Sequence, residues 1–63
     1  MKKITEINVR WKDGSENGTE TFTLEQLECS DIKTWTSLHY GDQKERLQKL
    51  LNSFPGNRKV DSW

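Results

Sequence analysis

The stretch from Asp42 to Phe54 constrains the fold most, because it has the sequence signature of a complete amphipathic helix. Asp42 can cap the first free amides of this helix, and Glu45 has the spacing that completes a capping box. Four apolar residues then recur at the interval that lines one helical face: Leu47, Leu50, Leu51 and Phe54. Pro55 follows and ends the helix. We therefore predict a helix over residues 42–54 whose apolar stripe packs against the rest of the chain.

The first part of the chain predicts an antiparallel β-hairpin. Residues 4–12 alternate apolar and polar side chains, as a strand with one wet face does, and one side of this strand carries Thr5, Ile7, Val9 and Trp11. Residues 13–18 contain an Asp-Gly and an Asn-Gly pair, the dipeptides most typical of tight hairpin turns. Residues 19–24 are rich in threonine and place Phe22 and Leu24 on one face, so we expect them to form the returning strand.

The segments on either side of the helix leave alternatives open. Thr23 and Gln26 have the spacing of a capping box, which predicts a short helical turn after the hairpin. Residues 31–40 begin with an aspartate cap and repeat apolar residues at a helical interval, but threonine is a mediocre helix former. They form either a helix or a third strand. The tail, residues 57–63, either folds back onto the sheet or remains a mobile arm.

The 63 residues are expected to form a single domain, residues 1–63. A domain of this size buries only about 60% of the surface that its unfolded chain exposes, so its stability margin is small. Cys29 is the single cysteine and His39 the single histidine, which excludes an internal disulfide and gives too few ligands for a zinc site. Burial against a protein partner, or against further copies of the chain, would supply the missing stability.

The sequence predicts a cytoplasmic protein without membrane contact. It has no apolar run of the roughly 20 residues that cross a bilayer. The basic start, Met1-Lys2-Lys3, is followed by alternating residues and not by the apolar core of a signal peptide. A lone cysteine also suits a reducing compartment.

Charge is segregated along the chain, although the net charge is zero. Residues 1–12 carry four basic and one acidic side chain, and residues 32–63 carry six basic and three acidic ones. Between them every charged residue is acidic, and we call this set the acidic block: Asp13, Glu16, Glu20, Glu25, Glu28 and Asp31. Gathered on one surface, these carboxylates would steer a basic partner into contact. The alternative is that they pair with neighbouring lysine and arginine side chains and serve solubility alone.

The groups that could carry catalysis do not form a recognisable motif. They are few: Cys29, Ser37, His39 and Asp42. Nothing in the sequence marks an activated thiol or an oxyanion hole. Glu25 and Glu28 could share a helical face, but they have the pattern of solvated side chains and not of an acid and a base. We expect no enzymatic activity and no cofactor.

Two places where basic and aromatic residues alternate suggest nucleic-acid binding as an alternative. Trp11 lies between two basic residues, and Trp63 follows the pair Arg58 and Lys59. Aromatic platforms beside basic groups hold single strands by stacking. Direct phosphate binders, however, carry a clear positive excess, and this chain has none.

These patterns favour an α+β domain in which the N-terminal hairpin, with or without a third strand, packs against the helix 42–54. We expect a non-enzymatic protein-binding module, an inhibitor or adaptor with aromatic anchors inside a charged rim. The predicted contact residues are Glu16, Glu20, Glu25, Glu28, Asp31, Trp35, Tyr40 and Trp63. The alternatives are a single-stranded nucleic-acid-binding protein and a homo-oligomeric scaffold or ligand-sequestering protein.

In size, tryptophan content and charge segregation, the chain resembles the small accessory proteins of phages and other mobile elements. Some proteins of that kind block host defence systems. No sequence motif carries this resemblance, which therefore implies a class of target and no particular residue.

Overall fold

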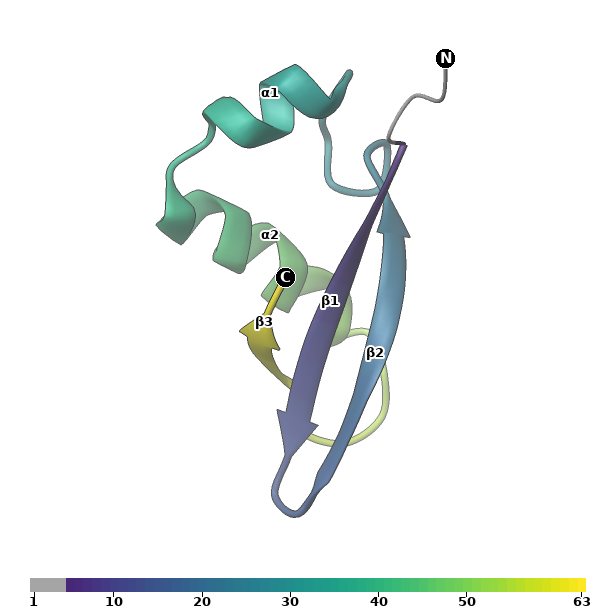
Figure 1. Cartoon of the computed structure of the whole chain (residues 1–63). Helices are drawn as coiled ribbons and strands as arrows, with labels where there is room; N and C mark the ends of the chain where they lie inside the picture. The colour runs from purple at the N-terminus through teal and green to yellow at the C-terminus, as the bar shows by residue number, and fades with distance from the viewer. Residues whose placement is uncertain (1–4) are drawn as a thin grey trace.

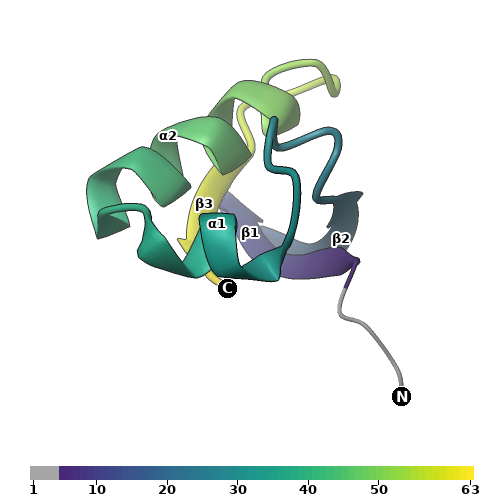
Figure 2. The ribbon, with the colours of Figure 1, turned by 90° about the horizontal axis from the view of Figure 1, so that it is seen from above.

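A three-stranded antiparallel sheet forms the frame of the protein. The computed structural model describes residues 5–63, so Ile4, where the first strand was predicted to begin, lies outside the described part. The elements follow in the order β1 (Glu6–Asp13), β2 (Glu16–Thr23), α1 (Ile32–Ser37), α2 (Tyr40–Leu51) and β3 (Lys59–Ser62). The strand order in the sheet is β2-β1-β3. Helix α2 lies over one face of this sheet (Figures 1 and 2), and the predicted α+β fold is confirmed.

The predicted hairpin is present, and its turn uses the first of the two candidate dipeptides. β1 and β2 pair without a register shift from Glu6 opposite Thr23 to Asp13 opposite Glu16. Gly14 has a φ of 62°, which glycine adopts at little cost, and it forms the turn with Ser15. The Asn-Gly pair therefore lies within β2 and not in the turn. On β1 the alternation predicted from the sequence holds, because the buried residues are Ile7, Val9 and Trp11.

A short helical turn follows β2, as the capping-box spacing predicts. The Thr23 backbone N–H donates to Gln26 Oε1 (2.8 Å), and the Gln26 N–H donates in return to Thr23 Oγ1 (3.1 Å). The turn ends at Glu28, whose φ is 60°. Beyond it the Cys29 N–H donates to the Leu24 carbonyl (2.9 Å), which is the closing bond of a Schellman motif.

The segment that left two structures open forms a helix. Asp31 caps α1 by accepting a hydrogen bond from the Thr34 N–H (2.8 Å), and Trp35 is buried beneath the helix. The third strand is therefore not residues 31–40. It comes from the tail, because residues 59–62 fold back and pair with β1 as β3.

The main helix begins earlier and ends earlier than its sequence pattern indicates. α2 starts at Tyr40, with His39 as its N-cap and no side-chain capping bond, so the prediction that Asp42 caps the helix is wrong. Asp42 lies in the first turn, where a carboxylate still interacts favourably with the free amides. Phe54 lies beyond the last helical residue, but its ring remains in the core, 6.3 Å from the ring of Phe22.

The core lies between α2, the α1 segment and one face of the sheet. Leu47 and Leu51 of the predicted apolar stripe are fully buried, and Leu50 is half-buried at the edge of the core. Among the described residues, the buried apolar set is Ile7, Val9, Trp11, Phe22, Leu24, Leu27, Cys29, Trp35, Leu47, Leu51 and Val60. None of the helices within residues 5–63 has the length and apolar character needed to traverse a lipid bilayer.

One side chain of α2 fastens β3 to the rest of the molecule. Gln48 accepts a hydrogen bond from the Val60 N–H at its Oε1 (3.0 Å) and donates from its Nε2 to the Arg58 carbonyl (2.8 Å). The amide group thus bonds the strand much as a neighbouring strand would. β3 is held by β1 on one side and by a glutamine on the other.

Candidate interaction surface

Tyr40, the first residue of α2, is the only exposed large hydrophobic residue in the described part of the chain, at 67% exposure. Its ring stacks on that of Trp63, with centroids 4.7 Å apart and planes 29° from parallel. Trp63 follows β3 and is half-buried against the core. We call these two residues the aromatic patch. Tyr40 covers Trp63, and its own ring stays largely open to solvent.

A glutamine fixes the position of the aromatic patch. The Trp63 Nε1–H donates to Gln43 Oε1 (3.1 Å), and the Gln43 Nε2 donates to the Trp35 carbonyl (2.7 Å). One side chain of α2 therefore joins the C-terminal indole to the end of α1. Because both ends of this amide are engaged, the indole that supports Tyr40 has a defined orientation in the free protein.

The structure brings together two of the three predicted aromatic anchors. Tyr40 and Trp63 form the aromatic patch, although 22 positions of sequence separate them. Trp35 does not join them, because it is only 4% exposed and belongs to the core. Its burial places Trp35 in the core and not on the surface, where an anchor would have to lie.

The predicted acidic surface is divided by local pairing. Glu20 lies on the core face of β2, and its Oε1 is 3.0 Å from Nη1 of Arg58. The Arg58 guanidinium carbon lies in turn 4.1 Å from the ring centroid of Trp11 and 4.8 Å from that of Phe54. Cation–π contacts of this kind are attractive, and here they hold an ion pair that is only partly exposed. Glu20 therefore has a structural contact inside the fold.

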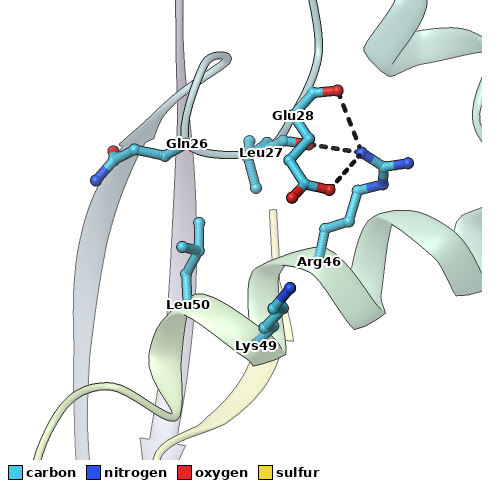
Figure 3. A pocket seen from close by; sticks show the side chains of 6 residues that line it. All are labelled: Gln26, Leu27, Glu28, Arg46, Lys49 and Leu50. Atoms are coloured by element: carbon cyan, nitrogen blue, oxygen red, sulfur yellow. Dashed lines mark hydrogen bonds and ion pairs between the residues drawn. The ribbon is translucent and has the colours of Figure 1, made fainter.

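Glu28 and Arg46 form a second local contact, drawn in Figure 3. Arg46 Nη1 donates to the Leu27 carbonyl (2.7 Å) and lies 3.4 Å from the Glu28 carbonyl and 3.9 Å from its carboxylate. Arg46 thus ties α2 to the end of the helical turn at residues 24–28. The Glu28 side chain itself is largely exposed, and a surface ion pair at this distance contributes little.

The groove between this turn and α2 is too small and too well paired to be a ligand site. It measures about 190 Å³ and is lined by Gln26, Leu27, Glu28, Arg46, Lys49 and Leu50 (Figure 3). Pockets that hold small molecules usually measure about 300–1,000 Å³. One nitrogen of the Arg46 guanidinium, Nη1, already donates to backbone carbonyls within the fold.

The remaining acids of the predicted surface differ in their surroundings. Asp31 caps α1, accepting hydrogen bonds from the backbone N–H and the hydroxyl of Thr34. Glu16 and Glu25 are exposed near opposite ends of β2, one at the turn of the hairpin and the other just after the strand. Glu16 and Glu25 are thus exposed to solvent, but the length of β2 separates them.

Two of the four groups considered for catalysis, Cys29 and Ser37, are engaged in packing or local hydrogen bonds. The Cys29 thiol is buried and donates to the Leu27 carbonyl (3.5 Å). The Ser37 hydroxyl donates to the Thr34 carbonyl (2.9 Å), as a helical serine commonly does. Within residues 5–63, no three histidine, cysteine, aspartate or glutamate side chains gather as ligands for a metal ion.

Trp11 does not offer the stacking platform on which the nucleic-acid alternative depends. Its ring lies on the core face of β1, is 9% exposed and contacts Arg58. Arg10 and Lys12 alternate with it and point to the opposite face, where Lys12 lies 3.7 Å from Asp61. The basic and aromatic groups that are adjacent in sequence are therefore on opposite sides of the sheet.

Sequence reasoning missed the residues that organise this surface: Gln43, Gln48, Arg46 and Arg58. The helical pattern assigns Gln48 and Arg46 to the solvated faces, and nothing distinguishes them from exposed polar side chains. Their partners are backbone carbonyls, amides and rings from distant parts of the chain. Only the fold reveals such partners.

Comparison with protein-family models, with curated proteins and with solved structures finds no match, so the surface is interpreted from its own geometry.

Proposed function

We propose that this chain is a non-enzymatic protein-binding module, an inhibitor or adaptor, whose partner docks on the aromatic patch of Tyr40 and Trp63. The observation that carries the proposal is the stack itself: Tyr40 is 67% exposed, yet its ring lies 4.7 Å from that of an indole anchored by Gln43. An isolated exposed tyrosine would be unremarkable on any surface.

Tyrosine and tryptophan dominate the few residues that supply most of the binding energy at protein interfaces. They combine a large contact area with few rotatable bonds, so their immobilisation costs little entropy. The hydrogen bond from Trp63 Nε1 to Gln43 reduces that cost further, because the indole already has its orientation before a partner arrives. The geometry of the aromatic patch therefore suits an anchor for a protein partner.

The environment of the candidate catalytic groups supports a non-enzymatic role. Cys29 is a buried apolar group bonded to a carbonyl, and Ser37 is bonded within its own helix. We place the protein in the cytoplasm, where an unpaired thiol stays reduced. The resemblance in size and charge segregation to phage accessory proteins makes a host defence protein one class of target to test.

Affinity capture with matched variants tests this proposal. The tagged wild-type chain, Tyr40→Ala and Tyr40→Phe are used to capture proteins from a nuclease-treated lysate of the native host. Tyr40→Phe keeps the stacking ring and Tyr40→Ala removes it. The proposal predicts a stoichiometric protein retained by the wild type and Tyr40→Phe and lost with Tyr40→Ala. Retention that is equal for all three chains would contradict it.

A further inference from the structure

Within residues 5–63, the outer edge of β2 is a regular run of backbone with which no other strand pairs. β2 comprises eight residues and pairs with β1 on one side only, because the sheet order is β2-β1-β3. Its pairing with β1 has no register shift, so the strand contains no bulge. Figures 1 and 2 both show β2 as the outermost strand of the sheet.

The hairpin turn determines which backbone groups of β2 face outward. In a hairpin with a two-residue turn, Asp13 and Glu16 exchange both backbone hydrogen bonds, and bonded pairs then alternate along the ladder. The hydrogen bond from the Leu24 N–H to the Thr5 carbonyl (2.9 Å) fits this alternation at the other end. The groups that point away from β1 therefore belong to every second residue: Asn17, Thr19, Thr21 and Thr23.

Only the last of these four residues has its outward groups engaged. The Thr23 N–H donates to Gln26 Oε1 (2.8 Å), and its carbonyl accepts from the Leu27 N–H (3.2 Å). Within residues 5–63, no hydrogen bond engages the outward backbone groups of Asn17, Thr19 and Thr21. These three residues present alternating donors and acceptors at the spacing that another strand requires.

The opposite edge of the sheet, formed by β3, is protected against pairing with a further strand, whereas the edge of β2 is open. β3 has four residues, its pairing with β1 contains a register shift, and Gln48 occupies the Val60 N–H. Proteins usually blunt an edge with lysine, proline, a bulge or a covering segment. β2 has no lysine, proline or bulge, and its charged residues are Glu16 and Glu20. Threonine, which favours strands, fills three of its positions.

The charge at this edge indicates the kind of strand that would pair with it. β2 and the following turn carry four acidic and no basic residues: Glu16, Glu20, Glu25 and Glu28. Glu20 is already paired with Arg58, but the Glu16 carboxylate is exposed, so a neighbouring strand with a basic residue opposite Glu16 would match the charge that this edge offers. A second copy of this chain would instead bring two acidic strands together, which like-charge repulsion disfavours.

We propose that the free edge of β2 binds, by strand addition, an extended segment of another protein that carries basic side chains. Main-chain hydrogen bonds to Asn17, Thr19 and Thr21 supply the binding, and the acidic side chains select the partner. This inference deepens the proposed function and rests on it, because it names the partner class of a protein-binding module. It uses a surface separate from the aromatic patch, so the two can be tested apart.

The test is a titration of the full chain with a synthetic peptide of about eight residues, the length of an ordinary strand. The peptide consists of threonine and valine with one lysine, placed to lie opposite Glu16 when the peptide pairs with β2, and a control peptide has glutamate in place of that lysine. Binding is followed by amide chemical shifts and by hydrogen exchange. We expect the lysine peptide to bind saturably and the glutamate peptide not to bind. Binding of the lysine peptide should slow hydrogen exchange at the amides of Asn17, Thr19 and Thr21.

Two variants of one residue separate strand addition from charge attraction. Thr19→Pro removes an outward N–H that β1 does not use, and Thr19→Val keeps that N–H with a side chain of similar shape. Thr19→Pro should weaken peptide binding about tenfold or more, while Thr19→Val changes it little. If Thr19→Pro does not fold, Glu16→Lys replaces it, and this variant should lose the preference for the lysine peptide.

Three results would overturn the proposal. The first is that the lysine peptide shows no saturable binding, and the second is that it binds without protecting the three amides. The third is that protection of these amides rises with protein concentration when no peptide is present, which would indicate that a second copy of the chain occupies the edge. Peptide failure alongside capture that depends on Tyr40 would remove the edge from the proposal and leave the proposed function. Peptide binding together with capture that does not depend on Tyr40 would keep the edge of β2 as a binding site and remove the aromatic patch from the proposed function.

Discussion

The indole ring of Trp11 lies directly over Gly18 on the neighbouring strand. A Cβ atom built on Gly18 would come within 2.5 Å of Cζ2 of Trp11, closer than real side chains approach one another. The two residues are opposite each other in the register of β1 and β2. Because Gly18 has no side chain, it leaves the space that the indole fills. Gly18 therefore has a packing role within the hairpin and does not form its turn.

Gly18→Ala should destabilise the fold by about 1–3 kcal/mol, the usual cost of overpacking a filled core, as measured by urea unfolding. Gly41→Ala is the matched control, because Gly41 lies in the first turn of α2 and an added Cβ would meet no atom within 4 Å apart from its chain neighbours and the helix's own backbone. That substitution should stabilise the helix, by up to about 0.5–1 kcal/mol. Equal effects of the two substitutions would contradict the close contact between Trp11 and Gly18.

Glu28→Gly should raise the free energy of unfolding by about 0.5–1 kcal/mol. Glu28 has a φ of 60°, a conformation that glycine adopts without the steric cost that other residues have. The loss of the contact with Arg46 subtracts little, since the Glu28 side chain is largely exposed.

Glu25→Gly provides the comparison for this prediction. Glu25 lies inside the same helical turn and has no positive φ, so glycine there should destabilise the protein. A destabilisation by Glu28→Gly as large as that by Glu25→Gly would show that the carboxylate of Glu28 matters more than its backbone conformation.

Gln48→Ala should loosen β3 and destabilise the fold by about 1–3 kcal/mol. The substitution leaves the Val60 N–H and the Arg58 carbonyl without the partner that α2 provides, and both groups are in a partly buried region. Hydrogen exchange at Val60 should become faster. The exposed neighbour Lys49→Ala should change stability by less than about 0.5 kcal/mol, and equal exchange at Val60 in both variants would disprove the role of Gln48.

Local chemistry made the hairpin and the first helical turn predictable. The alternation around Val9 and the reciprocal bonds of Thr23 and Gln26 depend on residues that are close in sequence. The same local rules misplaced the start of α2, because a good capping residue at Asp42 does not prevent the helix from beginning at Tyr40 when Gly41 fits into its first turn.

The parts that the sequence did not reveal depend on contacts between distant segments. β3 forms because its residues pair with β1 and because Gln48, on α2, takes the Val60 N–H. Arg58 looks like an exposed tail residue in the sequence, yet it stacks on Trp11 and pairs with Glu20. The aromatic patch likewise requires the tail to return to α2. Residue patterns therefore suggested Tyr40 and Trp63 as anchors, but they did not predict that the two rings stack on each other.

The most direct test of the proposed function is calorimetry with the captured partner. It compares the partner's affinity for Tyr40→Ala with its affinity for the wild type and for Tyr40→Phe. A central interface anchor contributes about 2 kcal/mol or more, so the proposal predicts at least about a thirtyfold weaker affinity for Tyr40→Ala. Tyr40→Phe keeps the stack on Trp63 and should bind within about threefold of the wild type. An unchanged affinity for Tyr40→Ala, in a chain whose unfolding free energy is also unchanged, would contradict the assignment of the aromatic patch as the binding site.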